Sequence, residues 1–138
     1  MPKLAVDLTA VNLVPEGNHE ALITDVKYQV KTGEKWNNEG TTTVSFEDWL
    51  PYPLEKRRIH LTLQPQTPGV NQFLWHDLYM IPTAAGFVKD WVRAAGVYFD
   101  KDGYDPDEFA GKTVGVSVII KEETPGMQRN EITKVYKV

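Results

Sequence analysis

The sequence predicts an all-β domain, built as a five-stranded β-barrel with one α-helix. Segments of alternating apolar and polar residues, bounded by Gly, Pro and Asn, recur along the chain, as strands and turns do. One stretch, residues 83–95, instead has apolar residues at the 3.6-residue period of a helix. Three predicted strands precede this helix and two follow it. That order of strands and helix along the chain is typical of an OB-fold-like barrel, a fold that commonly binds oligonucleotides.

The composition is that of a single globular domain. The 138 residues suffice for one hydrophobic core, and residues 1–14 are expected to form an N-terminal extension. The chain has no cysteine, which excludes disulfides and thiolate sites and fits a reducing cytosol. No apolar run approaches the roughly 20 residues that cross a bilayer, and the N-terminus is too polar for a secretory signal. We therefore expect a cytoplasmic protein that does not associate with a membrane.

The first predicted strand covers residues 19–30 and changes phase in its middle. Ala21 and Ile23 occupy one parity, whereas Val26, Tyr28 and Val30 occupy the other. A phase change inside a strand predicts a β-bulge, which lies here near residues 24–25. Bulges supply the curvature that a small barrel requires.

The second predicted strand covers residues 57–64, where Ile59, Leu61 and Leu63 alternate on one face. Pro51 and Pro53 interrupt the β-prone segment before it, which argues against one continuous central strand. Residues 36–54 are therefore expected to form an elaborated loop, or an extra hairpin, between strands one and two.

The third strand is expected at residues 73–81, and the helix at residues 83–95. Thr83 is a suitable N-cap, and Gly96 a suitable left-handed terminator. The apolar stripe of the helix predicts which of its side chains pack on the core. These are Phe87, Val88, Trp91, Val92 and Ala95.

The last two strands are expected at residues 112–122 and 131–138, after an acidic segment, residues 100–108. This segment holds five carboxylates and one lysine, so it accounts for the whole net charge of −4. Asp105 and Pro106 predict the start of a one-turn helix, where acidic residues are favourable. The alternative is a calcium site, but the spacing departs from that of an EF-hand loop.

No catalytic constellation is recognisable, so the protein is expected not to be an enzyme. His19, His60 and His76 lack the spacing of a helical zinc motif. Neither Ser45 nor Ser117 lies in a nucleophile elbow, and no glycine-rich phosphate loop is present. No metal or cofactor is therefore expected, although carboxylate chemistry without a known motif remains an alternative.

The first two thirds of the chain interleave the residue types that bind single-stranded nucleic acid, which are cations for phosphates and aromatic rings for bases. For some of them a structural role is the alternative to nucleic-acid binding. Trp75 would then be buried in the core, Lys27 and Lys31 would be ordinary solvated strand positions, and Trp36 would dock onto the barrel. Arg57 and Arg58 must face opposite sides of their strand. The candidate binding residues are Lys27, Tyr28, Lys31, Lys35, Trp36, Trp49, Tyr52, Arg57, Arg58, His60, Trp75 and, in the last loop, Arg129.

Several short motifs occur in a characteristic order. They are PEGNHEALI (15–23), KTG (31–33), AAGV (94–97), FAGK (109–112) and RNEI (129–132). In this order the chain resembles a phage and prophage family of small OB-fold single-stranded-DNA-binding proteins, long catalogued as a domain of unknown function. The resemblance covers residues 15–138, and the long 36–54 segment departs from it. It implies sequence-tolerant, non-catalytic binding of single-stranded DNA in phage replication or recombination, in the cytoplasm of a bacterial host.

The alternative function is a protein-interaction or virion-assembly β domain that does not bind nucleic acid. The net negative charge and the proline-flanked aromatic patch at residues 49–53 would suit such a role. Under the DNA-binding hypothesis, the acidic segment 100–108 could recruit phage replication or recombination proteins. A homodimer is compatible with the sequence.

Overall fold

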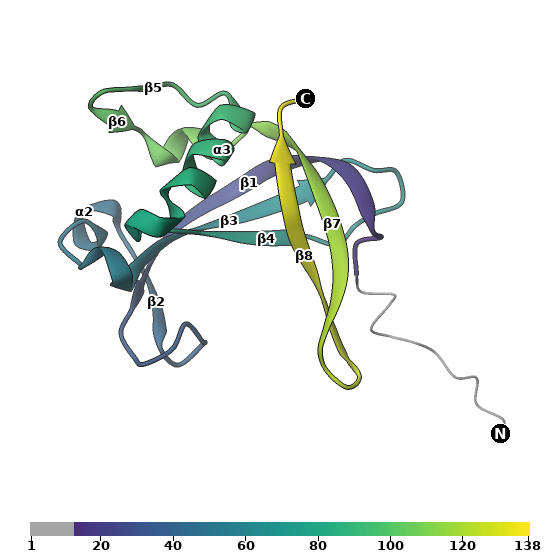
Figure 1. Cartoon of the computed structure of the whole chain (residues 1–138), viewed down its shortest axis with the longest axis horizontal. Helices are drawn as coiled ribbons and strands as arrows, with labels where there is room; N and C mark the ends of the chain where they lie inside the picture. The colour runs from purple at the N-terminus through teal and green to yellow at the C-terminus, as the bar shows by residue number, and fades with distance from the viewer. Residues whose placement is uncertain (1–12) are drawn as a thin grey trace, which may run out of the picture.

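The computed structural model describes residues 13–138, and it is mostly β with one helix of more than one turn (Figure 1). Residues 1–12 of the expected N-terminal extension lie outside the described residues. Short 3-10 helices cover Leu54–Lys56, Pro82–Ala84 and Pro106–Phe109. The other elements are β1 (Gly17–Lys31), β2 (Thr41–Val44), α2 (Phe46–Trp49), β3 (Arg57–Pro65), β4 (Leu74–Tyr79), α3 (Ala85–Ala95), β5 (Phe99–Asp100), β6 (Gly103–Tyr104), β7 (Thr113–Thr124) and β8 (Met127–Tyr136).

The main sheet is antiparallel and has the order β4-β3-β1-β7-β8, with β2 added to the end of β1. β5 and β6 form a separate two-stranded sheet. Within residues 13–138 no ladder joins β4 to β8, so the sheet is open at that seam. The order of strands and helix agrees with the prediction, but the expected closed barrel is not confirmed.

The centre of the sheet is β1, which bends so that it can pair with three other strands. Residues 17–22 pair with β7, residues 21–30 with β3, and residues 28–31 with β2. The register shifts between Ile23 and Asp25, which confirms the predicted bulge. Beside the bulge, the Ile23 amide donates to the Lys112 carbonyl and the Gly111 amide to the Ile23 carbonyl, both at 2.8 Å.

The segment between the first and second predicted strands contains an extra hairpin rather than a plain loop. β2 folds back on the end of β1, and α2 follows it. Ser45 caps α2 by accepting a hydrogen bond from the Asp48 amide. The predicted second strand is β3, which begins at Arg57 as expected.

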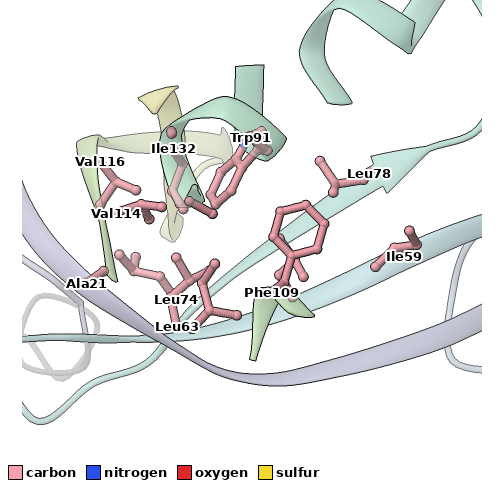
Figure 2. Close-up of a cluster of buried hydrophobic side chains, with 14 of the residues drawn as sticks. Ala21, Ile59, Leu63, Leu74, Leu78, Trp91, Phe109, Val114, Val116 and Ile132 are labelled. Atoms are coloured by element: carbon pink, nitrogen blue, oxygen red, sulfur yellow. The ribbon is translucent and has the colours of Figure 1, made fainter. Parts of the chain in front are cut away.

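α3 covers one face of the sheet and encloses the core (Figure 1). Figure 2 shows Trp91 of α3 lying over this core, beside Val114, Val116 and Ile132, with Phe109 between the sheet and the helix. Val88, Trp91, Val92 and Ala95 are buried, as the helical period predicts. Phe87 is 69% exposed, so its predicted place in the core is wrong. It lies at the open seam, where no strand covers it.

Both ends of α3 follow from local chemistry. Gly96 adopts the left-handed conformation with φ of 69°, which confirms the predicted terminator. The start is different from the prediction, because a 3-10 turn at Pro82–Ala84 precedes the helix and Thr83 makes no capping hydrogen bond. Asp105 does cap the turn Pro106–Phe109, by accepting from the Asp107 amide.

A glycine in β7 is required by an aromatic side chain in β8. Gly115 pairs with Tyr136, and a Cβ at Gly115 would overlap the Tyr136 ring. We expect Gly115→Ala to lower the free energy of unfolding by about 1–3 kcal/mol, measured by urea denaturation. Adding Tyr136→Ala should recover part of that loss, because it removes the overlapping ring.

Gly86→Ala is the matched control, since Gly86 lies in α3 with open space around its Cβ position. It should stabilise the protein by about 0.5–1 kcal/mol. Equal effects of the two glycine substitutions would contradict the packing of Tyr136 on Gly115.

Candidate functional site

The face of the sheet that points away from α3 collects the polar and aromatic side chains of β1, β3 and β4. Ile59, Leu61 and Leu63 of β3 are buried on the core side, so the residues between them point outward. Directly opposite residues on antiparallel strands share a face. The pairing therefore places three rows on the outer face: Gln29, Arg58 and Tyr79; Lys27, His60 and Asp77; and Asp25, Thr62 and Trp75.

Arg58 makes the most contacts on the outer face. Its Nε donates to Gln29 Oε1 at 2.9 Å, and its Nη1 donates to the Tyr79 hydroxyl at 3.3 Å. The same Nη1 lies 3.3 Å from Asp77 Oδ2. Its side chain is only 12% exposed, although it points away from the core. The planar guanidinium thus connects all three strands of this face.

Trp36 covers the guanidinium of Arg58. The Arg58 Cζ atom lies 4.4 Å from the centre of the Trp36 ring, which is a cation–π contact. The ring of Tyr79 meets Trp36 edge-on at 5.9 Å, and Lys31 Nζ lies 5.8 Å from the Trp36 ring. Trp36 is therefore docked on the sheet while part of its ring stays exposed. Of the two expectations for this residue, docking is confirmed, and stacking on a base remains a prediction.

A tight loop between β1 and β2, residues 32–40, holds Trp36 in this position. The amides of Thr32 and Gly33 both donate to the Gly40 carbonyl, and the Gly40 amide donates to Asn37. A Cβ at Gly33 would lie 2.9 Å from Gly40 Cα, and a Cβ at Gly40 would overlap the Lys35 carbonyl. Glycine at both positions lets the loop close on itself.

His60 and Asp77 form a pair next to Arg58. His60 Nδ1 lies 2.6 Å from Asp77 Oδ1, and the second oxygen of Asp77 faces Arg58. The carboxylate is thus held between two basic groups. Lys27 lies on the other side of His60, and its ammonium group is 3.9 Å from Asp25.

A pair of exposed aromatic rings lies at the start of β4, where Phe73 directly precedes the strand and Trp75 is within it. Trp75 is 59% exposed and Phe73 is 44% exposed, with their ring centres 6.5 Å apart. Burial of Trp75 in the core, which the sequence left open, is therefore wrong. Neither Phe73 nor Tyr79 belongs to the predicted set. Their shared parity with Asp77 was the available signal, because a carboxylate marks the outward face of a strand.

Other predicted site residues lie away from this face. Tyr28 and Trp49 are buried, and they pack against each other with ring centres 5.3 Å apart. Trp49 Nε1 donates to the Arg58 carbonyl, and Arg57 stacks on the Trp49 ring at 4.6 Å. Tyr52 is half-buried against the same core. The expectation that these rings meet a base is not supported, because the α2 rings cover Tyr28, and Trp49 and Tyr52 pack inward against the core. The opposite facing of Arg57 and Arg58 is confirmed.

Tyr28 has a structural role that the sequence did not indicate. Its hydroxyl donates to Asp107 Oδ1 at 2.6 Å, which ties β1 to the turn Pro106–Phe109. Burial raises the pKa of Tyr28, and its hydrogen bond to the Asp107 carboxylate raises it further. The phenol therefore stays protonated and acts as a donor.

The two remaining cations lie apart from Arg58, and Arg129 is in β8 rather than in the predicted last loop, because the hairpin turn is tighter than expected and β8 already begins at Met127. Lys35 is exposed in the loop 32–40. Arg129 lies in the β7–β8 hairpin, where its Nη2 is 2.9 Å from Glu123 Oε1. Figure 1 shows that the loop after β1 and this hairpin both extend from the side of the sheet opposite α3. They flank the outer face without being part of the Arg58 cluster, which consists of Arg58 with Gln29, Trp36, Asp77 and Tyr79.

A hollow of about 460 Å³ lies at the open seam between β4, β8 and α3. Phe87, Trp91 and Tyr136 contribute aromatic walls, and Lys134 lies among the residues of β8 that line it. His76 stacks on Trp91 with ring centres 4.5 Å apart. Burial lowers the pKa of His76 to about 4, against an opposing effect of the nearby Asp77 and Glu131 carboxylates.

The histidines have separate partners. His19 lies 2.6 Å from the Thr67 hydroxyl, His60 binds Asp77, and His76 lies on Trp91. Among residues 13–138, no group of three or more His, Cys, Asp or Glu side chains is arranged to hold a metal ion. In the same part of the chain, no helix is both long enough and apolar enough to span a membrane.

The sequence matches no protein-family model and no sequence among the curated proteins.

The Arg58 cluster predicts a stability effect that charge alone does not explain. Lysine keeps the charge but cannot reproduce the planar fork that contacts Gln29, Tyr79 and Asp77. We expect Arg58→Lys to lower the free energy of unfolding by about 1–3 kcal/mol in urea denaturation. The control is Arg129→Lys, at an ion pair whose two side chains are both about half exposed, with an expected change below about 1 kcal/mol. A larger loss at Arg129 would contradict the role of Arg58.

Because burial favours the neutral form of His76, we expect acid to lower the stability of the fold. Because the folded-state pKa of His76 is about 4, below its ordinary value of 6.5, the unfolded chain binds this proton first as pH falls. The stability contributed by neutral His76 is thus present above about pH 6.5 and is lost as the pH falls toward 4, by up to about 3 kcal/mol. Urea denaturation at several pH values should show this slope, and His76→Phe should reduce it. Identical slopes for the two proteins would exclude His76 as the cause.

Proposed function

We propose that this protein is a non-catalytic, sequence-tolerant single-stranded-DNA-binding protein. The observation that carries the proposal is the outer face of β1, β3 and β4, which combines accessible aromatic rings with cations. Trp75 and Phe73 lie toward one end of it, and Trp36 with Lys31 toward the other. Single-strand binding requires both components, because bases stack on rings while cations follow the phosphates.

The architecture supports the same proposal. The order β4-β3-β1-β7-β8, with α3 between β4 and β7, is the order expected of an OB fold, whereas the sheet itself is open between β4 and β8. In OB folds, the binding face is made by the second and third strands and by the loops after the first and fourth strands. The counterparts here are β3, β4, the loop 32–40 and the β7–β8 hairpin. In line with the family resemblance, we propose a role in phage replication or recombination in the bacterial cytoplasm.

The proposed mode of binding uses two stacking positions. Thr62, beside Trp75, and Arg58, beneath Trp36, are four residues apart on β3, which corresponds to about 13 Å along the strand. Lys27 and His60 lie between these positions. Stacking on rings and contacts with phosphates do not read base edges, so little sequence preference is expected.

The distribution of charge also favours this face. Asp25 and Asp77, the carboxylates on its three rows, are each within 4.0 Å of a basic group. The acidic segment 100–108 accounts for the whole net charge of −4. It follows α3, and Figure 1 draws β5 and β6 on the α3 side of the sheet. Repulsion of phosphates is therefore concentrated away from the outer face.

Titration of the protein with an oligo-dT strand tests the proposal. Trp36 and Trp75 are accessible whereas Trp49 and Trp91 are buried, so binding should quench only part of the tryptophan fluorescence. Trp75→Ala and Trp36→Ala should each weaken binding by about 1–3 kcal/mol. Affinity should fall steeply as salt rises. Phe87→Ala removes an exposed ring on the α3 side and should change nothing.

Absence of quenching and of a mobility shift at low salt would exclude the proposal. Equal losses from Phe87→Ala and Trp75→Ala would exclude the outer face as the site. Light scattering measures the size of the protein with and without the oligonucleotide. A stable oligomer whose size does not change on adding DNA would favour the alternative, a protein-interaction or assembly domain.

A further inference from the structure

A separate apolar hollow lies on the α3 side of the molecule, and Tyr79 of β4 borders both this hollow and the guanidinium of Arg58. It has a volume of about 300 Å³ and lies between α3, the segment that follows β4, and the β5–β6 hairpin. Ala85, Val88 and Val92 of α3 form one wall. Ile81 contributes from the segment after β4, and Phe99 and Tyr104 from the hairpin.

The apolar lining remains partly open to solvent. Phe99 is 47% exposed and Ile81 is 38% exposed, although each lies beside a cavity lined by other apolar side chains. Tyr98, the neighbour of Phe99, is 70% exposed. Contiguous apolar surface around a concave site is typical of a docking surface.

One wall of this hollow belongs to the acidic segment 100–108. Asp100 contributes to its lining, whereas Asp102, Asp105, Asp107 and Glu108 are its neighbours in the sequence, and Asp107 accepts the hydrogen bond of the Tyr28 hydroxyl. None of these carboxylates forms an ion pair with another residue of the described chain, 13–138. Lys89 and Lys101 are the nearby cations in the lining and in the segment, so the excess charge is negative. A ligand must therefore tolerate or prefer a negative field.

We propose that this hollow docks a lysine- or arginine-rich segment of another protein, through one bulky apolar side chain. The apolar walls provide the anchor pocket, and the acidic segment that begins at Asp100 attracts the flanking cations of the partner. Charge complementarity selects this occupant over two others. A nucleic acid would bring phosphates toward carboxylates that form no ion pair within residues 13–138, and a second copy related by a two-fold axis would bring one acidic segment against another.

Fluorescence anisotropy with labelled peptides tests the docking site. The probes are short lysine-rich peptides with a central Leu, Phe or Trp; the matched probes replace that residue with Ser, or the lysines with Glu. Binding is expected only when both the apolar residue and the lysines are present. Phe99→Ser should weaken binding about tenfold, because it removes an apolar wall. Asp100→Asn should weaken it about threefold, and more at low salt than at high salt.

Two variants serve as controls. Phe87→Ser alters an exposed phenylalanine of α3 outside this hollow, and Glu55→Gln removes an exposed carboxylate distant in sequence. Both should bind the peptides as the wild type does. Phe99→Ser should also leave oligo-dT binding unchanged, so failure of this inference is distinguishable from failure of the DNA-binding proposal.

Three results would overturn the inference. They are the absence of binding by every lysine-rich apolar peptide, equal binding by the glutamate peptides, and peptide binding that Phe99→Ser does not alter. Displacement of the peptide by oligo-dT would also overturn it, because the hollow would then belong to the nucleic-acid surface.

Discussion

The bend in β1 is the constraint on which the rest of the structure depends. Ala21 and Ile23 before the bulge, and Tyr28 and Val30 after it, are all buried. Without the extra residue at the bulge, one of the two halves would turn its apolar side chains to solvent. The bend also lets β1 leave β7 and continue along β3. The sheet can thus curve around α3 on one side while its other side stays open to solvent.

That open side is ordered by a polar interaction, not by hydrophobic burial. Arg58 connects Gln29, Tyr79 and Asp77 across three strands, and its guanidinium supports the Trp36 ring. A tryptophan on a surface loop would ordinarily lose considerable freedom on binding a ligand. Because the loop 32–40 and Arg58 already fix its position, less of that loss remains to be met when a ligand packs against it.

The two sides of the domain differ in charge and therefore in the partners they suit. The side with Trp36 and Trp75 carries Lys27, Lys31 and Arg58, and its carboxylates are neutralised by close cations. The α3 side carries the acidic segment 100–108, of which Asp100 lines an apolar hollow. One small domain can thereby present a surface suited to polyanions and another suited to cationic peptides. Such a separation would let a strand of DNA and a partner protein bind together.

The sequence by itself determined features that depend on local periodicity. It predicted the bulge in β1, the end of α3 at Gly96, the opposite facing of Arg57 and Arg58, and the order of strands and helix. Only the tertiary structure decided which faces are covered. Tyr28 and Trp49 are buried because α2 packs its Trp49 ring against Tyr28 of β1. Trp75 is exposed because α3 packs on the opposite face of β4, and Phe87 is exposed because the seam between β4 and β8 stays open. The physical reason is that alternation along a strand or helix fixes which side chains share a face. Whether that face meets solvent depends on segments far away in the chain.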